Sequence, residues 1–131
     1  MTTVKPFLMF QDGKAREAID FYVSSLPNSR IIALELFGQG GPGPEGTVKR
    51  ANLSLCGQPV MVTDSHIKHA FTFTPATSLF VDCESDSEID GLYATLSTGG
   101  RALMPLGVYG FSRKFGWIED RFGVSWQLNL A

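Results

Sequence analysis

The sequence predicts an α+β fold built from two βαβββ modules. The first observation behind this is an internal repeat, because residues 7–22, FLMFQDGKAREAIDFY, are similar to residues 78–93, SLFVDCESDSEIDGLY. Tyr22 and Tyr93 occupy the same place in the two copies. The second observation is that each copy is followed by three segments of alternating apolar and polar residues, which is typical of strands. Because a repeated unit gives two similar halves, we expect a ligand pocket where the halves meet.

In the first module, one helix is expected between the first and second strands. Apolar residues at helical spacing predict it over 14–26, before Pro27-Asn28. The Gly-rich stretch 38–46 predicts a loop, either an ordinary hairpin loop or a mobile lid over a ligand. Gly57-Gln58 predicts a two-residue hairpin turn. Strands are expected at 4–10, 29–37, 47–56 and 59–64.

The second module repeats this order. Ser85 or Asp86 is expected to cap its helix, with Glu88 in the first turn and Gly99-Gly100 at the end. Strands are expected at 77–83, 101–107, 112–120 and 124–130. The first module covers about 1–66 and the second about 75–131, and we predict that they form a single domain over 1–131.

The composition is that of a globular protein. Of 131 residues, 44% are hydrophobic and 18% are charged. The net charge of −2, with both signs dispersed along the chain, predicts neither nucleic acid nor an anionic membrane as a partner. No segment approaches the roughly 20 apolar residues of a membrane helix. The N-terminal residues do not resemble a secretory signal, so we expect a cytoplasmic protein.

Alternation along the strands predicts that each sheet has an apolar face toward its helix and a mixed face of polar and aromatic side chains. We assign Val60, Val62 and Asp64 to the mixed face of the first sheet. A concave mixed surface suits a small molecule, and the alternative is an open sheet face in contact with solvent. Candidates for ligand contact are Phe7, Arg50, Asn52, Asp64, Ser78, Phe80, Trp117, Glu119 and Gln127.

Four of these candidates have specific roles to test. Arg50 and Asp64 are expected on neighbouring strands, where they form an ion pair unless Arg50 binds an anionic ligand instead. Trp117 either stacks on a planar ligand or is buried. Asp64 and Glu119 are the candidate general acids or bases, should burial raise their pKa.

Three stretches, 6–22, 74–93 and 109–130, resemble the PhnB-like branch of the vicinal-oxygen-chelate superfamily, which includes glyoxalases and bleomycin-resistance proteins. The last stretch, with F-G-W-I-x-D-x-F-G-V-x-W-x-L, is the most specific. The resemblance implies curled mixed sheets around a cavity. It also implies a homodimer, because modules of this superfamily commonly pair across a dimer. The branch carries the name 3-demethylubiquinone-9 3-methyltransferase, but the Gly-rich stretch 38–46 joins two strands, whereas a site for S-adenosylmethionine usually needs such a turn between a strand and a helix.

Enzymes of this superfamily usually hold a divalent metal with four side chains, from the first and last strands of each module. The resemblance places Phe7, Ser78, Asp64 and Gln127 at these positions. Phenylalanine cannot ligate a metal, and a neutral serine is a poor ligand for zinc or nickel. We therefore expect no cofactor, with a divalent metal as the less favoured alternative.

A second candidate metal site is the pair His66 and His69. Their spacing brings two imidazoles together on a helical turn, but no third ligand lies near them in the sequence. The alternative is that both are exposed residues of the connection between the modules, which still allows them to border a pocket.

These features support three functions. The first is a metal-free, dimeric, PhnB-like protein that binds a small molecule of unknown identity. The second is a glyoxalase-like enzyme, isomerase or lyase that uses a divalent metal, Asp64 or Glu119. The third is a sheet that faces only a partner chain. Turnover and metal content separate the first two.

Overall fold

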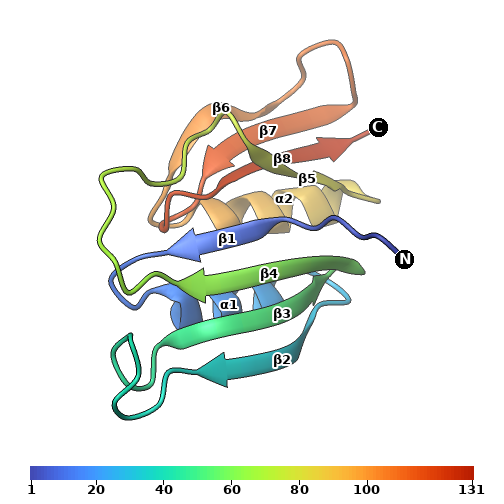
Figure 1. Cartoon of the computed structure of the whole chain (residues 1–131). Helices are drawn as coiled ribbons and strands as arrows, with labels where there is room; N and C mark the ends of the chain where they lie inside the picture. The colour runs from blue at the N-terminus through green and yellow to red at the C-terminus, as the bar shows by residue number, and fades with distance from the viewer. The chain divides into compact units, whose positions relative to one another are not determined.

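The computed structural model describes residues 1–131 and divides into two compact units, Met1–Ala70 and Phe71–Ala131. Each unit holds one four-stranded sheet and one helix (Figure 1). This arrangement confirms the predicted α+β class with two βαβββ modules. No helix of the chain is long and apolar enough to cross a membrane.

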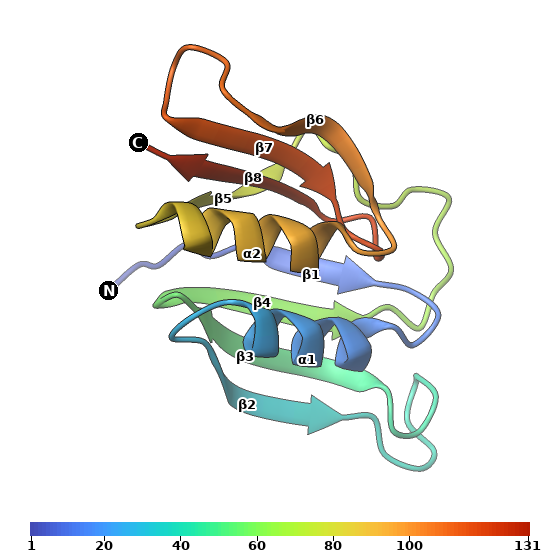
Figure 2. The ribbon, with the colours of Figure 1, turned by 180° about the vertical axis from the view of Figure 1, so that it is seen from behind.

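The first unit is a mixed sheet with α1 packed on one face. Its elements are β1 (Phe7–Phe10), α1 (Ala15–Ser25), β2 (Arg30–Leu36), β3 (Val48–Leu55) and β4 (Gln58–Asp64). The strand order is β1-β4-β3-β2, with β1 parallel to β4 and the other pairs antiparallel. Figure 2 shows α1 across β3 and β4. Ala18, Ile19 and Tyr22 on this side of α1 are fully buried, as their helical spacing predicts.

The second unit repeats the topology. Its elements are β5 (Ser78–Asp82), α2 (Asp86–Ser97), β6 (Arg101–Gly107), β7 (Lys114–Glu119) and β8 (Ser125–Leu130). The strand order is β5-β8-β7-β6, and only β5 and β8 are parallel. Buried Ile89, Leu92 and Leu96 make the inner side of α2, which packs on β6, β7 and β8. We call the sheet face away from the helix the open face of each unit.

The turn between β3 and β4 lies one residue earlier than predicted. Leu55 pairs with Gln58, so the turn residues are Cys56 and Gly57, with φ of 51° and 87°. Two positive φ angles are the requirement of the favoured two-residue hairpin, and glycine meets it more easily than glutamine. Gln58 is the first residue of β4.

The predicted orientation of Val60, Val62 and Asp64 is wrong. Val60 lies opposite Leu53 and Val62 opposite Ala51, and cross-strand neighbours share a sheet face. All three predicted residues therefore point toward the α1 side and are buried. Between them, Met61 and Thr63 are half-buried and belong to the open face.

In the second unit the predicted faces agree with the register. Ser78 lies opposite Ser125 and Phe80 opposite Gln127, so these four residues share the open face. Trp126, which lies between Ser125 and Gln127 on β8, is 1% exposed and is on the α2 side. The open face of this sheet therefore contains the candidates Ser78, Phe80 and Gln127.

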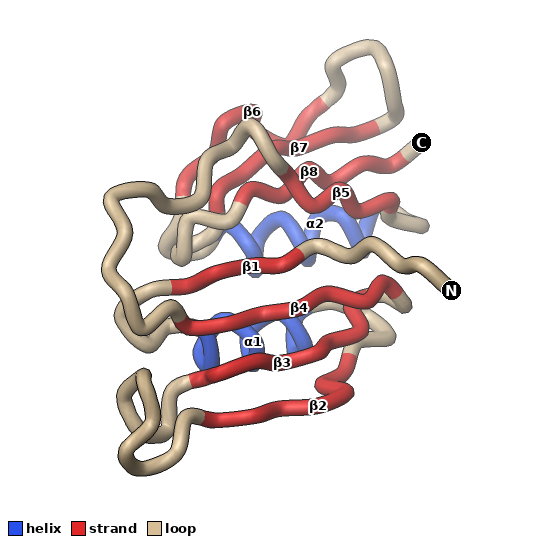
Figure 3. The backbone as a smooth tube through the Cα atoms, viewed as in Figure 1, coloured by secondary structure: helices blue, strands red, loops and turns tan.

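The Gly-rich loop 38–46 connects β2 and β3, and Figure 3 draws it without regular structure. The Phe37 N–H donates to the Thr47 carbonyl (2.8 Å), and the Gly46 N–H donates to the Phe37 carbonyl (3.0 Å). A Cβ at Gly43 would lie 2.7 Å from the Phe37 ring, so glycine lets the ring pack directly on the loop backbone. The loop is therefore closed at its base by backbone hydrogen bonds and filled by an aromatic ring.

Candidate functional site

A chain of side-chain hydrogen bonds crosses the open face of the second sheet. Trp117 Nε1 donates to Ser125 Oγ (2.8 Å), the Oγ atoms of Ser125 and Ser78 lie 2.6 Å apart, and Gln127 Nε2 donates to Ser78 Oγ (3.2 Å). The strand register creates this chain, because Ser125 faces Ser78 on β5 and Gln127 faces Trp117 on β7. We call these four residues the serine network.

Aromatic rings lie next to the serine network on the same sheet. Phe80 is 56% exposed, and its ring centroid is 6.5 Å from that of Phe115. Phe115 shares the open face with Trp117 by strand alternation, and is itself covered by Phe111 at 4.9 Å and Tyr109 at 6.3 Å. Exposed ring faces beside fixed polar groups are typical of a surface that binds a planar ligand.

One charged pair borders the network. Arg101 Nε and Nη2 donate to the two carboxylate oxygens of Glu119 at 2.9 and 3.1 Å. Glu119 lies opposite Ser125 in the sheet. The hydrogen bonds from Arg101 lower the pKa of Glu119 and raise the pKa of Arg101. Together the two side chains present no net charge to the network.

The open face of the first sheet holds three of the other four candidates, without a comparable network. Phe7 is 58% exposed, and Asn52 is half-buried between Ala33 and Met61 on the neighbouring strands. Arg50 lies opposite Glu35 on β2, and its Nη2 is 3.4 Å from Glu35 Oε1. The predicted ion pair between Arg50 and Asp64 is therefore wrong.

Asp64 has a structural role under the sheet. It is 3% exposed, and its Oδ1 accepts a hydrogen bond from the Ala15 N–H (2.9 Å) while Oδ2 accepts one from the Val48 N–H (2.9 Å). Ala15 is the first residue of α1, and Lys14 before it makes no side-chain cap. Asp64 thus caps a helix that lacks a local cap, and both carboxylate oxygens are engaged.

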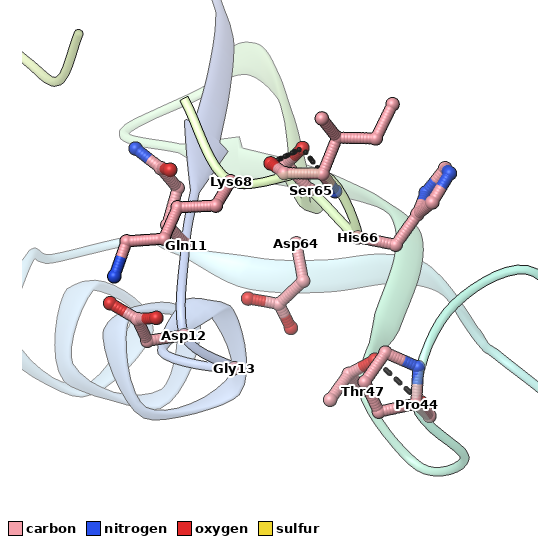
Figure 4. Close-up of a pocket in the computed structure, with 10 residues that line it drawn as sticks. Gln11, Asp12, Gly13, Pro44, Thr47, Asp64, Ser65, His66 and Lys68 are labelled. Carbon is pink, nitrogen blue, oxygen red and sulfur yellow. Dashed lines mark hydrogen bonds between the residues drawn. The ribbon is translucent and has the colours of Figure 1, made fainter. Parts of the chain in front are cut away.

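A pocket of about 370 Å³ lies beside Asp64, at one end of the first unit (Figure 4). Residues 11–13, 64–68, Pro44 and Thr47 line it. The volume is within the range of small-ligand sites. Most of the lining residues are polar in type. Sequence reasoning missed this pocket because three separate segments of the chain form it.

The two histidines do not act as a pair. The His66 ring lies edge-on to Phe37, with centroids 6.0 Å apart, and lines the pocket. His69 Nε2 lies 3.0 Å from Ser65 Oγ, and the backbone N–H of His69 donates to Gln11 Oε1 (2.8 Å). They lie in a segment without helical structure, so the predicted helical spacing does not apply.

The four positions that the resemblance assigned to a metal do not fit one. Phe7 has no donor atom, and the Ser78 hydroxyl is bonded within the serine network. Each oxygen of the Asp64 carboxylate accepts a hydrogen bond from a backbone N–H group on the α1 side of its sheet. Gln127 then provides the only other donor, a neutral amide, which is weak for a divalent ion. No group of three or more His, Cys, Asp or Glu side chains lies close enough to hold a metal.

Sequence reasoning missed several parts of the site on the second sheet. Arg101 neutralises Glu119, and Tyr109 and Phe111 cover Phe115. Ser125 was not among the candidates. The signal available for it was its position, two residues before Gln127 on an alternating strand.

Comparison with known proteins places the chain in a family. The family model described as 3-demethylubiquinone-9 3-methyltransferase matches residues 2–129. A Bacillus cereus structure described as a putative 3-demethylubiquinone-9 3-methyltransferase, PhnB protein, is 51% identical, with a TM-score of 0.95 over 99% of this chain and 100% of that one. Protein YjdN of Escherichia coli K12 is 24% identical over 98% of this chain and 95% of its own length.

A more distant structure supports the fold alone. A glyoxylase/bleomycin resistance protein/dioxygenase domain from Frankia sp. EAN1pec is 13% identical, with a TM-score of 0.68 over 100% of this chain and 92% of that one. The two-module fold of this chain is therefore shared with that domain.

Proposed function

The chain belongs to the 3-demethylubiquinone-9 3-methyltransferase family of PhnB-like proteins, and from that premise we propose that it binds a small molecule on the open face of the second sheet. The serine network is the observation that carries the proposal. It fixes four polar side chains in defined positions beside the exposed ring of Phe80. Polar side chains on a solvent-facing sheet have no need of such ordering, whereas a binding surface benefits from groups held in place before the ligand arrives.

The charges at the site favour binding over catalysis. A general base works best when its pKa lies near the working pH, and Arg101 lowers the pKa of Glu119 instead. Asp64 uses both carboxylate oxygens to hold backbone N–H groups. Neither candidate acid or base is thus available for proton transfer, and we do not propose the glyoxalase, isomerase or lyase alternative.

The family description also names a methyltransferase, and we do not extend that activity to this chain. In the usual nucleotide-binding arrangement, a Gly-rich turn joins a parallel strand to a helix. Here the Gly-rich loop 38–46 joins β2 to antiparallel β3. The residues present therefore do not fit the site that S-adenosylmethionine usually requires.

A thermal-shift screen of small aromatic compounds, aromatic and aliphatic phosphonates and divalent metals tests the proposal. We expect stabilisation by planar organic compounds, weakened in Gln127→Ala and unchanged in Asn52→Ala. The second variant is the matched control, because Asn52 is also a half-buried amide on an open sheet face, but in the first unit. Hits that are lost in Asn52→Ala and kept in Gln127→Ala would overturn the proposal.

Two further parts of the proposal concern the state of the protein. We propose that it carries no resident metal, so that metal analysis of protein purified without a histidine tag gives far less than one zinc, nickel or manganese ion per chain. A homodimer and a cytoplasmic location remain predictions. Light scattering of the purified protein measures the first of these directly.

A further inference from the structure

The hydrogen-bond pattern of the serine network specifies the chemistry of the ligand. Ser125 Oγ receives the Trp117 indole N–H, and Ser78 Oγ receives an amide N–H of Gln127. The only other side-chain contact of either serine is the 2.6 Å contact between the two hydroxyls. One hydroxyl must donate to the other, and this single hydrogen bond uses only one of the two hydroxyl hydrogens. One hydrogen is left over.

Burial decides which serine holds that hydrogen. Ser125 is 1% exposed, whereas Ser78 is half-buried. A donor left without an acceptor is costly in a buried place and cheap at a surface. Ser125 therefore donates to Ser78, and the Ser78 hydroxyl directs its own hydrogen out of the network, toward the open face.

The surroundings of this donor exclude a preference for charged ligands. The guanidinium that borders the network, that of Arg101, is engaged by both oxygens of Glu119. Asp82, further along β5, accepts a hydrogen bond from Asn129 Nδ2 (3.1 Å). A carboxylate or phosphate would contact one neutral hydroxyl donor and a guanidinium that is already paired. These contacts would not offset the cost of removing the anion from water.

We propose that the ligand is an uncharged planar compound with a carbonyl-type oxygen, which accepts the Ser78 hydrogen while its ring lies against Phe80 and Trp117. This inference rests on the proposed function, and names the ligand class for the same site. It assigns Ser78 a direct contact and Ser125 a positioning role.

Acetophenone and its hydrocarbon isostere α-methylstyrene test the inference, because they share shape and differ in the acceptor oxygen. Their binding is followed by the indole N–H signals in ¹H–¹⁵N spectra. Trp117 reports on the site, and Trp126, whose indole donates to buried Asp120, is the internal control. We expect acetophenone to shift the Trp117 signal only, and to bind about fivefold more tightly than α-methylstyrene, the effect of one neutral hydrogen bond. Benzoate is expected to bind more weakly than acetophenone.

Two serine variants complete the test. Ser78→Ala is expected to abolish the preference for acetophenone, whereas Ser125→Ala keeps it because the Ser78 hydrogen remains available. An unchanged Trp126 signal in both variants verifies that the second unit is folded. Three results would overturn the ligand class but not the proposed binding face. They are equal affinity for acetophenone and α-methylstyrene, tighter binding of benzoate than of acetophenone, and equal loss of the acetophenone preference in both variants. If neither acetophenone nor α-methylstyrene shifts the Trp117 signal of the folded protein, the ligand class and the proposed binding face both fail.

Discussion

The two modules share one topology but begin their helices in different ways. In the second module, the Ser85 hydroxyl accepts the Glu88 N–H (3.2 Å), and Glu88 accepts the Glu84 N–H (2.9 Å). In the first module, Lys14 provides no side-chain cap, and Asp64 caps α1 from the end of β4. A local cap involves only residues close in sequence, whereas a cap from another element couples the helix to the sheet. The first module therefore depends on one long-range contact where the second uses a local one.

The open faces of the two sheets also differ, in how their polar side chains are held. The second sheet carries four polar side chains joined by hydrogen bonds, next to a group of aromatic rings. The first carries the surface ion pair of Arg50 and Glu35, with both side chains more than half exposed. Exposed pairs of this kind contribute little energy. One copy of the module thus has an ordered surface suited to recognition, and the other has its most constrained polar group in the core.

The largest expected effect is on the long-range cap. Asp64→Asn keeps the shape but gives the two backbone donors at Ala15 and Val48 only one acceptor oxygen, with an amide donor facing the other. We expect a loss of about 3 kcal/mol in the free energy of unfolding, measured by urea denaturation. Asp12→Asn, an exposed aspartate in the same pocket, is the control and is expected to change little. A loss below about 0.5 kcal/mol for Asp64→Asn would contradict the capping role.

The ends of the helices provide the second contrast. Gly99 and Gly100 follow the C-terminal end of α2, and a Cβ at Gly100 would lie 2.0 Å from the Glu119 carbonyl oxygen. Because a backbone atom cannot move aside cheaply, we expect Gly100→Ala to cost about 2 kcal/mol. Gly91→Ala in the middle of α2 has open space for its methyl group and is expected to stabilise by about 0.8 kcal/mol. Equal effects of the two substitutions in thermal unfolding would refute the close packing at Gly100.

The local cap of α2 gives the third effect. Ser85→Ala removes the acceptor for the Glu88 N–H, and we expect it to cost about 1 kcal/mol. Lys14→Ala at the corresponding position of α1 is expected to be close to neutral, because Lys14 makes no cap hydrogen bond. Chemical denaturation of both variants measures the contrast. A greater loss for Lys14→Ala than for Ser85→Ala would reverse the comparison between the modules.

The smallest effect concerns the pH dependence of the pair beside the serine network. Arg101 lowers the pKa of folded Glu119 below its ordinary value of about 4.3, so the pair stabilises the protein fully above that pH. The contribution is lost as the pH falls through the lowered pKa. The stability difference between wild type and Glu119→Gln is therefore expected to be constant from neutral pH down to about 5 and to shrink in more acidic solution. A difference that grows on acidification would contradict the assigned direction.

The sequence predicted the element order and the faces of the second sheet, because the apolar alternation through Leu128, Trp126 and their neighbours has a single interpretation. In the first sheet the same reasoning failed at Asp64. Alternation assigned Asp64 to the mixed face together with Val60 and Val62, whereas the chain buries Asp64, where it satisfies two backbone donors. Such a contact joins residues far apart in sequence and leaves no local pattern. The turn was predicted one residue late because Gly57 lies in both possible pairs of turn residues, and the structure gives Cys56 the other positive φ.

The candidate site was predictable as single residues but not as a network. Ser78, Trp117 and Gln127 were identified by alternation and by resemblance. Their hydrogen bonds depend on the register between β5, β7 and β8, which Ser125 links. A shift of one residue would have moved each of these side chains to the other face.

The most direct test of the central claim is a backbone amide map of ligand contact, by ¹H–¹⁵N chemical-shift perturbation with a compound that stabilises the protein. We predict that the largest shifts fall on open-face residues of β5, β7 and β8, around Ser78, Trp117 and Gln127. Shifts confined to β1–β4, or to the loops around the pocket beside Asp64, would contradict it.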